Sequence, residues 1–246
     1  MLNNILKIIA IFIIGSIGGI FADQILWPYF IERPLFLKYS LEQEPVYVTE
    51  KKEIFIQENI ALTNAIEKTE NSVVAISKKI NNKKSLVGSG LIITRDGLIV
   101  TLSEIIPKDI CFNIFINNDK QEIQNCKVLK RDNKNNLVLI KIEKNNLKTC
   151  GFFDFEKIKI GQRVFSIGAI QKLDNDKKYV FTPIVNQGII SYFNKEFIYT
   201  DISQKNNINS SILFDIEGKA VGINFLNKQG ETITIPSNKI REFIGF

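Results

Sequence analysis

Short runs of β-branched and aromatic residues, separated by turn signals, fill the chain from about residue 71 to its end. The runs that we interpret as strands are 73–76, 91–93, 98–101, 112–116, 137–142, 164–167, 188–191, 197–200, 220–225 and 232–235. The turn signals lie at 95–97, 118–119, 217–219 and 228–230. Many short strands at this spacing are typical of an all-β sandwich or barrel.

The N-terminal segment, residues 6–22, is apolar apart from Lys7. With its flanks it can cover about 20 residues of membrane, and Trp27 then falls where interfacial aromatic residues gather. We therefore predict a single-pass anchor in the cytoplasmic membrane over residues 1–27, with the N-terminus inside and the rest of the chain outside. A cleaved signal peptide is the alternative, although Ile20 is bulky for a cleavage site.

Residues 28–58 are predicted to be a connector, because Pro28, Pro34 and Pro45 interrupt any long helix. The β-rich domain then occupies residues 59–246. We expect a helix over 59–70 to open this domain and a helix over 238–244, capped by Ser237, to close it.

The net charge is +6, and the lysines and arginines are scattered along the chain. A nucleic-acid surface would gather them into a stripe with stacking aromatic residues, so no nucleic-acid partner is expected. A mildly basic face near an anionic lipid surface is an equally good explanation of the charge.

The three cysteines are Cys111, Cys126 and Cys150. If residues 118–119 form a hairpin tip, Cys111 and Cys126 lie opposite each other, and a cross-strand disulfide becomes a hypothesis suited to an oxidising compartment. The alternative is that both are small buried hydrophobic residues. No spacing indicates a metal site, and we expect no metal or cofactor.

Four segments, taken in order, resemble the HtrA/Deg branch of the trypsin-like serine proteases. They read GSGLIITRDGLIVT at 88–101, NLVLIKI at 136–142, IGQRVFSIG at 160–168 and EGKAVGIN at 217–224. The resemblance covers roughly residues 59–246. It implies an all-β fold of two six-stranded antiparallel barrels with a cleft between them. The sequence ends directly after the closing helix, so we expect the PDZ domain that often follows in this family to be missing.

The resemblance also locates the positions of the catalytic triad. The family's histidine falls on Glu104 and its aspartate falls on Asn136, and the whole chain contains no histidine. Trypsin-like chemistry needs an imidazole to take the proton of the serine, and an amide cannot stabilise an imidazolium as a carboxylate does.

The nucleophile position remains open at this stage. Counting back from Gly218 without a gap puts Asn209 where the serine belongs, whereas a one-residue deletion would put Ser210 there. In either alignment the family's GNSGG has become residues 207–211, which read NINSS. The loss of these glycines puts the oxyanion hole in doubt.

Another chemistry could in principle have replaced the triad. Ser210 or Ser211 could pair with a lysine base, and Lys205 and Lys219 flank the segment, but spacing marks neither lysine. Glu104 is a weak base toward a serine hydroxyl.

The sequence therefore predicts a membrane-anchored trypsin-like pseudoprotease that binds or scaffolds extended peptides or envelope proteins. An active serine endopeptidase that uses Ser210 without histidine is one alternative. A structural subunit that assembles through the β domain or the anchor is the other.

Overall fold

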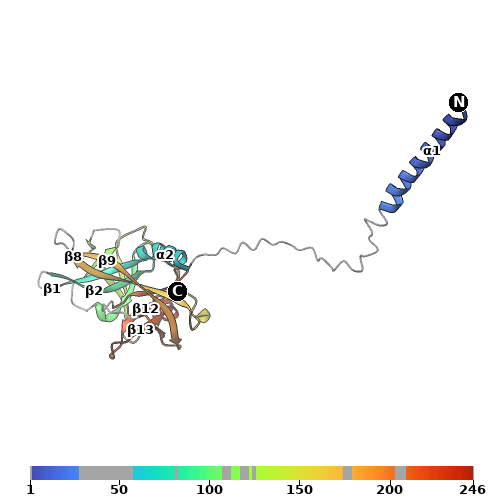
Figure 1. Cartoon of the computed structure of the whole chain (residues 1–246). Coiled ribbons are helices and arrows are strands. Elements are labelled where there is room, and N and C mark those ends of the chain that lie inside the picture. The colour runs from blue at the N-terminus through green and yellow to red at the C-terminus, as the bar shows by residue number, and fades with distance from the viewer. Residues whose placement is uncertain are drawn as a thin grey trace. The chain divides into compact units, whose positions relative to one another are not determined.

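The computed structural model describes residues 2–27, 58–80, 83–106, 112–116, 122–123, 126–173, 179–202 and 209–245. These residues belong to two compact units, an N-terminal helix and a β-rich domain (Figure 1). The predicted connector lies outside the described residues except for Glu58, which begins the first helix of the domain.

The N-terminal unit is helix α1 (Leu2–Phe21), which continues as a short π-helix, η1 (Ala22–Leu26). Residues Asn3–Leu26 have a mean hydropathy of 2.4 and are long and apolar enough to cross a membrane. A signal sequence shares this length and composition, so the helix fits both predicted alternatives.

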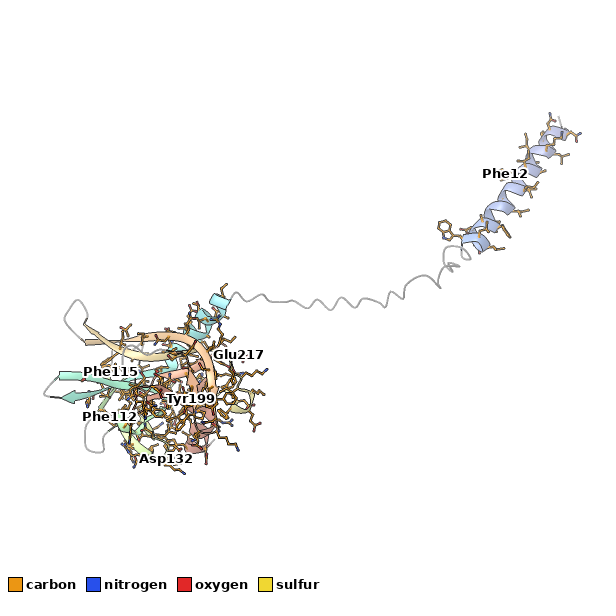
Figure 2. All side chains as sticks on the ribbon, turned by 60° about the horizontal axis from the view of Figure 1, so that its bottom comes forward. Phe12, Phe112, Phe115, Asp132, Tyr199 and Glu217 are labelled. Carbon is orange, nitrogen blue, oxygen red and sulfur yellow. The ribbon has the colours of Figure 1, made fainter. Side chains whose placement is uncertain are left out.

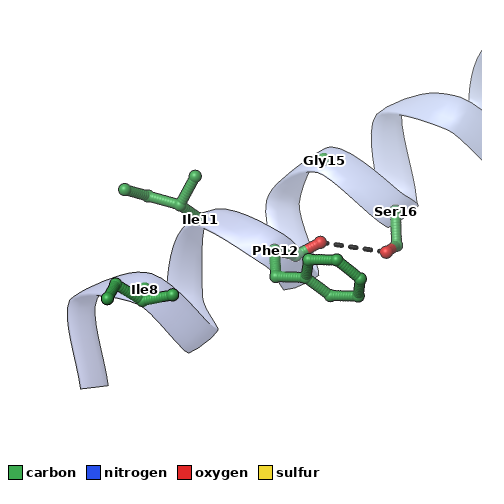
Figure 3. Close-up of a pocket in the computed structure, with 5 residues that line it drawn as sticks. All are labelled: Ile8, Ile11, Phe12, Gly15 and Ser16. Atoms are coloured by element: carbon green, nitrogen blue, oxygen red, sulfur yellow. Dashed lines mark hydrogen bonds between the residues drawn. The ribbon is translucent and has the colours of Figure 1, made fainter. Parts of the chain in front are cut away.

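One face of α1 has a shallow hollow between Ile8, Ile11, Phe12, Gly15 and Ser16 (Figure 3). Gly15 contributes no side chain there, which leaves the space beside the Phe12 ring open. The Ser16 hydroxyl donates a hydrogen bond of 2.9 Å to the carbonyl oxygen of Phe12, so the helix satisfies its own polar group.

The domain begins with a seven-stranded antiparallel sheet in the order β5-β4-β1-β2-β3-β7-β6. The strands are β1 (Val73–Ile80), β2 (Lys83–Ile92), β3 (Leu98–Leu102), β4 (Phe112–Ile116), β5 (Glu122–Ile123), β6 (Cys126–Asp132) and β7 (Leu137–Ile142). The sheet has one strand more than predicted because the two-residue β5 adds to its edge beside β4.

The second half of the domain is a closed antiparallel barrel in the order β10-β13-β12-β11-β8-β9. Its strands are β8 (Arg163–Leu173), β9 (Tyr179–Phe193), β10 (Ile198–Thr200), β11 (Ile212–Asp215), β12 (Ala220–Leu226) and β13 (Thr232–Pro236). This barrel and the preceding sheet confirm the predicted trypsin-like architecture of two antiparallel β parts.

Helical segments lie at the ends of the domain and between its strands. They are α2 (Glu58–Thr69), η3 (Glu70–Ser72), η4 (Ser103–Ile105), η5 (Phe155–Lys157) and α3 (Ser237–Ile244). The prediction that Ser237 caps the closing helix is wrong. Pro236 holds the cap position, and the Ser237 hydroxyl instead donates to the carbonyl oxygen of Phe153 at 2.8 Å.

One hydrophobic cluster joins the two β parts. It contains Ile76, Leu102 and Ile140 from the sheet, and Phe165 and Phe214 from the barrel, all of them fully buried. The two phenylalanine rings stack with their centroids 5.4 Å apart. Because burial of such large side chains stabilises the fold by about 1.5–3 kcal/mol each, the shared core fixes the sheet against the barrel.

The predicted turns form where glycine permits a left-handed backbone. Gly97 has φ +101° and Gly218 has φ +80°. The amide of Gly97 donates to the carbonyl oxygen of Thr94, and the amide of Gly218 donates to that of Asp215. Glu217, labelled in Figure 2, lies in the second of these turns, between β11 and β12. The tip predicted at residues 118–119 lies outside the described residues.

Candidate functional site

The structure brings together the histidine and aspartate positions of the resemblance, Glu104 and Asn136, with Asn209, one of the two alternatives for the serine position. Glu104 lies in η4 after β3, Asn136 precedes β7, and Asn209 precedes β11 of the barrel. The side-chain amide of Asn209 donates a hydrogen bond of 2.8 Å to the carboxylate of Glu104. The backbone amide of Glu104 donates to Asn136 Oδ1 at 3.2 Å. The cluster therefore draws on both β parts of the domain.

The turn before β7 delivers Asn136 to the site. Asp132, labelled in Figure 2, ends β6 and accepts hydrogen bonds from the backbone amides of Lys134 and Asn135 at 2.9 and 3.1 Å. Asn136 itself has φ +54°, a left-handed conformation that asparagine adopts more readily than most residues. The local sequence thus supplies the turn without a glycine.

The side chain of Asn136 supports η4 and does not contact the Glu104 carboxylate through any recorded hydrogen bond. Its Oδ1 atom accepts from the Ser103 hydroxyl at 2.8 Å and from the backbone amide of Glu104. Its backbone oxygen accepts from the Ser103 amide at 3.0 Å. Asn136 therefore fixes the backbone at Glu104, which is a structural role.

Arg131 is a supporting residue that the sequence interpretation missed. Its guanidinium donates to the carbonyl oxygens of Ser103 and Ile106 at 2.7 and 2.5 Å. These two bonds fasten both ends of the turn that presents Glu104. An arginine on an exposed edge strand gives no sequence signal for this task, because its target is backbone.

The chemistry available to Asn209 and Glu104 is limited. A carboxamide is not a nucleophile of the kind that attacks peptide carbonyls, and here its amide group donates to the carboxylate that would have to act as the base. The Oδ1 atom of Asn209 is buried and has no hydrogen-bond partner among the described residues. The pair is thus a hydrogen-bonded contact between the two β parts, and in the described part of the chain no hydroxyl or thiol donates a hydrogen bond to the Glu104 carboxylate.

Ser210, the alternative nucleophile, is held inside the protein by contacts with the backbone of Ser89 and Asn209. It is fully buried and has φ +63°. Its hydroxyl accepts from the backbone amide of Ser89 at 2.6 Å and lies 2.7 Å from the Ser89 carbonyl oxygen and 2.5 Å from that of Asn209, to one of which it donates. Among the described residues no lysine amine bonds to this hydroxyl, and Lys205 lies outside them.

Ser211 is also buried and belongs to a second polar network. Its hydroxyl accepts from the side-chain amide of Asn224 at 3.0 Å, and Asn224 Oδ1 accepts from the Thr234 hydroxyl at 2.5 Å. All three residues are about 1% exposed. Ser211 therefore helps to fill the barrel interior, and the second serine candidate is not available to solvent either.

Ser89 links the sheet to the barrel at the centre of the site. Its hydroxyl accepts from the backbone amide of Ala169 in β8 at 2.9 Å, and its carbonyl oxygen accepts from the Thr101 hydroxyl at 2.6 Å. The neighbouring Gly88 is tightly enclosed: a Cβ atom there would lie 2.4 Å from Ser210 Oγ. The glycine pair predicted in this hairpin is therefore needed for close packing.

Residues 207 and 208 lie outside the described residues, so the prediction about the oxyanion hole is untested. Cys126 and Cys150 are free thiols, and burial raises the pKa of each to about 11. Cys111 lies outside the described residues. No group of three or more potential metal-binding side chains occurs in the described part of the chain.

A closed antiparallel barrel, a second antiparallel sheet that shares its core, and a polar cluster drawn from both define the class of trypsin-like domains. Residues 88–223 match the family described as "Trypsin-like peptidase domain", a match that covers more than half of the chain. The chain therefore belongs to this family, and its similarities place it in the HtrA-like branch.

Two curated relatives illustrate the similarity. A protein named "Probable periplasmic serine endoprotease DegP-like" from Halomonas elongata is 29% identical over 154 residues, which cover 58% of this chain and 30% of the relative. "Serine protease HTRA1A" from Danio rerio is 27% identical over 208 residues, or 74% of this chain and 40% of the relative. The chain thus spans less than half the length of these two relatives.

A solved structure, the serine endoprotease from Yersinia pestis, superposes with a TM-score of 0.62. The superposition covers 75% of this chain and 65% of that chain, at 23% sequence identity. At this identity the likeness establishes the fold.

Proposed function

We propose that this chain is a trypsin-like pseudoprotease of the cell envelope that binds extended polypeptides without cleaving them. The observation that carries the proposal is the 2.8 Å hydrogen bond between the Asn209 amide and the Glu104 carboxylate. It joins the position that the resemblance assigns to the histidine with one of the two positions that it allows for the serine. With no histidine in the chain, the reaction lacks its base as well as its nucleophile.

The envelope location rests on two observations. Helix α1 can span a membrane, and the DegP-like relatives are named as periplasmic proteins. The single charge of the apolar segment, Lys7, favours an orientation with the N-terminus inside and the domain on the extracytoplasmic side.

The Ser210 endopeptidase receives little support. The Ser210 hydroxyl is buried and bonded to the backbone of Ser89, so attack on a substrate would require both hydrogen bonds and the surrounding packing to open. A nucleophile has to reach the scissile carbonyl and an activating base together. Neither condition is met by the contacts of Ser210.

A strand edge beside Asn209 supports peptide binding. The backbone of Asn224 in β12 faces β11. Its amide donates to the carbonyl oxygen of Ser211, and its carbonyl oxygen accepts from the Ser210 amide. Since backbone direction alternates along a strand, the amide and carbonyl of Leu226 face the same side, and no described residue of β11 pairs with Leu226 there. An extended peptide can add there as a further strand.

The absence of hydrolysis is tested on the domain, residues 58–246, with a fluorophosphonate serine-hydrolase probe. Ser210→Ala and Ser211→Ala are the matched variants, and active trypsin is the control for the probe. We expect no labelling of any of the three proteins. Labelling of the parent domain that one of the alanine variants loses would identify the nucleophile and overturn the proposal.

Strand addition is tested by fluorescence polarisation with labelled β-casein, an unstructured polypeptide. Leu226→Pro removes the backbone donor that faces the open edge, whereas Leu226→Ala keeps it. We expect the proline variant to bind at least about tenfold more weakly, the effect of about 1.4 kcal/mol expected for a hydrogen bond that is lost. Equal loss in both variants would show that the side chain is recognised, and would contradict strand addition.

A further inference from the structure

The β1–β2 hairpin carries a concentration of positive charge that the proposed function does not use. Between Asn71 and Thr94 the sequence contains four lysines and no acidic residue. The four are Lys78, Lys79, Lys83 and Lys84. All of them lie at the end of the hairpin, where the first strand finishes and the second begins.

The register of the hairpin brings these charges together. Lys79 pairs directly with Lys84, Lys78 pairs with Ser85, and Ile80 pairs with Lys83. Paired residues belong to the same face of a ribbon and successive residues to opposite faces. One face therefore receives Lys79 and Lys84 as a direct pair, and the other receives Lys78 and Lys83 as a diagonal pair. Like charges in such positions repel each other.

No described strand other than β1 and β2 pairs with the end of the hairpin. The pairing of β1 with β4 ends at Lys78, which lies opposite Phe112. Among the described residues, 79–80 and 83–84 pair only with each other, as a two-stranded ribbon (Figure 1). We call residues 78–80 and 83–85 the basic ribbon.

Other lysines of the domain form ion pairs, and Lys78 of the basic ribbon differs from them in this respect. Lys141 pairs with Asp96, Lys219 pairs with Glu217, and Lys239 pairs with Glu196. Lys78 has no such ion pair with a described residue. The nearest acidic residue in sequence, Glu70, lies eight positions before Lys78. The ribbon thus carries four lysines and no acidic residue of its own.

We propose that the basic ribbon binds the anionic phospholipid headgroups of the membrane that α1 spans. A layer of headgroups can surround a ribbon that is basic on both faces, and can relieve the repulsion on each. The length of the chain also allows the ribbon to reach that membrane, because a segment as long as residues 28–57 can extend up to about 100 Å. The apolar α1 makes a lipid surface the partner available to this chain, ahead of a nucleic acid.

The expected strength follows from the charge of each lysine. A lysine close to an anionic leaflet strengthens binding about fivefold. Neutralising all four lysines should therefore lower the vesicle partition coefficient by at least about 25-fold, even if only two of them reach the surface. The effect should weaken at high salt, because the attraction acts within about one Debye length.

The test uses the domain, residues 58–246, which forms a compact unit with its own core. Its binding to vesicles of phosphatidylcholine, with or without 30% phosphatidylglycerol, is measured by co-sedimentation. The ribbon variant is K78Q/K79Q/K83Q/K84Q. The matched control, K148Q/K159Q/K195Q/K228Q, removes the same charge from four exposed lysines elsewhere. Circular dichroism establishes that all three proteins are folded.

We expect the parent domain and the control to bind the anionic vesicles, and the ribbon variant to lose this binding. An equal loss in both variants would assign the effect to net charge and overturn the proposal, as would absence of binding by the parent domain. A parallel titration with a 30-base-pair DNA duplex measures whether the ribbon binds a nucleic acid instead. If the ribbon variant lost binding to the duplex and not to the vesicles, a nucleic acid would replace the membrane as partner.

Discussion

Replacing Gly88 with alanine places a methyl group against the hydroxyl that joins the sheet to the residues around Asn209. The new Cβ atom would lie 2.4 Å from Ser210 Oγ and 2.9 Å from the carbonyl oxygen of Asn209. Ser210 cannot simply rotate away, because its hydroxyl is held by the amide and carbonyl of Ser89. Overpacking of this kind costs about 1–3 kcal/mol. Loss of the Ser210 hydrogen bonds adds about 1 kcal/mol each.

Gly88→Ala should therefore lower the free energy of unfolding by about 3–5 kcal/mol. Ser210→Gly removes the same hydrogen bonds. It also removes the backbone strain of about 1–2 kcal/mol that a non-glycine residue has in the left-handed conformation. Alone it should therefore change the free energy of unfolding by no more than about 1 kcal/mol. In the double variant the closest clash is gone. Its cost should be smaller than the sum of the two single costs by at least about 1 kcal/mol.

Urea unfolding of the domain, followed by far-ultraviolet circular dichroism, measures all four proteins of this cycle. The contact to the Asn209 carbonyl oxygen remains in the double variant, so rescue should be partial. If the two costs added to within about 0.5 kcal/mol, the clash at Ser210 Oγ would not be the cause, and the tight enclosure of Gly88 would be refuted.

Three further predictions concern titratable groups. Burial raises the pKa of Asp215, so the folded state holds its proton more tightly and this residue's contribution to stability falls as the pH rises above the ordinary aspartate range. The urea midpoint of Asp215→Asn, relative to that of the parent, should rise over the same range, and a constant difference would contradict this. A hydrogen bond from Lys141 lowers the pKa of Asp96 to about 2, so its contribution is present above pH 3.8 and is lost as the pH falls toward 2. Asp96→Asn should remove this loss from an acid titration of stability, and 0.5 M salt should shrink the effect because both groups are exposed to solvent. Because burial raises the pKa of Cys126 and Cys150 to about 11, iodoacetamide at pH 8 should leave both unmodified in the folded domain and alkylate both in urea, as peptide mapping will report.

The strands that the sequence predicted share one property: their own residues favour an extended, buried backbone. β11 and β6 were missed for different reasons. β11 has only four residues, all of them buried, so it shows no alternation of polar and apolar residues that would identify a strand. β6 is largely exposed at the edge of the sheet, and its register with β7 shifts at a bulge after Val128, which breaks the alternation that identifies a strand. The ends of β8 and β9 are extended by pairing with each other, which composition does not encode.

The site was predictable as a set of positions, and its contacts were not. Ordered motifs pointed to Glu104 and Asn136 and left Asn209 and Ser210 as alternatives, because a family keeps its strands in order but a deletion shifts a loop by one residue. They did not indicate that Asn136 would bond to backbone, or that Arg131 would fasten the same turn. Such contacts depend on side-chain direction after folding, and a backbone carbonyl presents the same target whatever residue bears it.

Ser210 combines an unusual backbone conformation with a buried hydroxyl. In the ungapped alignment with GNSGG it follows Asn209 at a position where the family has glycine, and it has a left-handed backbone with φ +63° that glycine adopts without strain. A serine there costs about 1–2 kcal/mol unless its hydroxyl is satisfied. The hydrogen bonds to Ser89 provide that compensation across the boundary between sheet and barrel. The same bonds hold the hydroxyl inside the protein, so the contacts that stabilise this serine in the fold also keep its hydroxyl away from solvent.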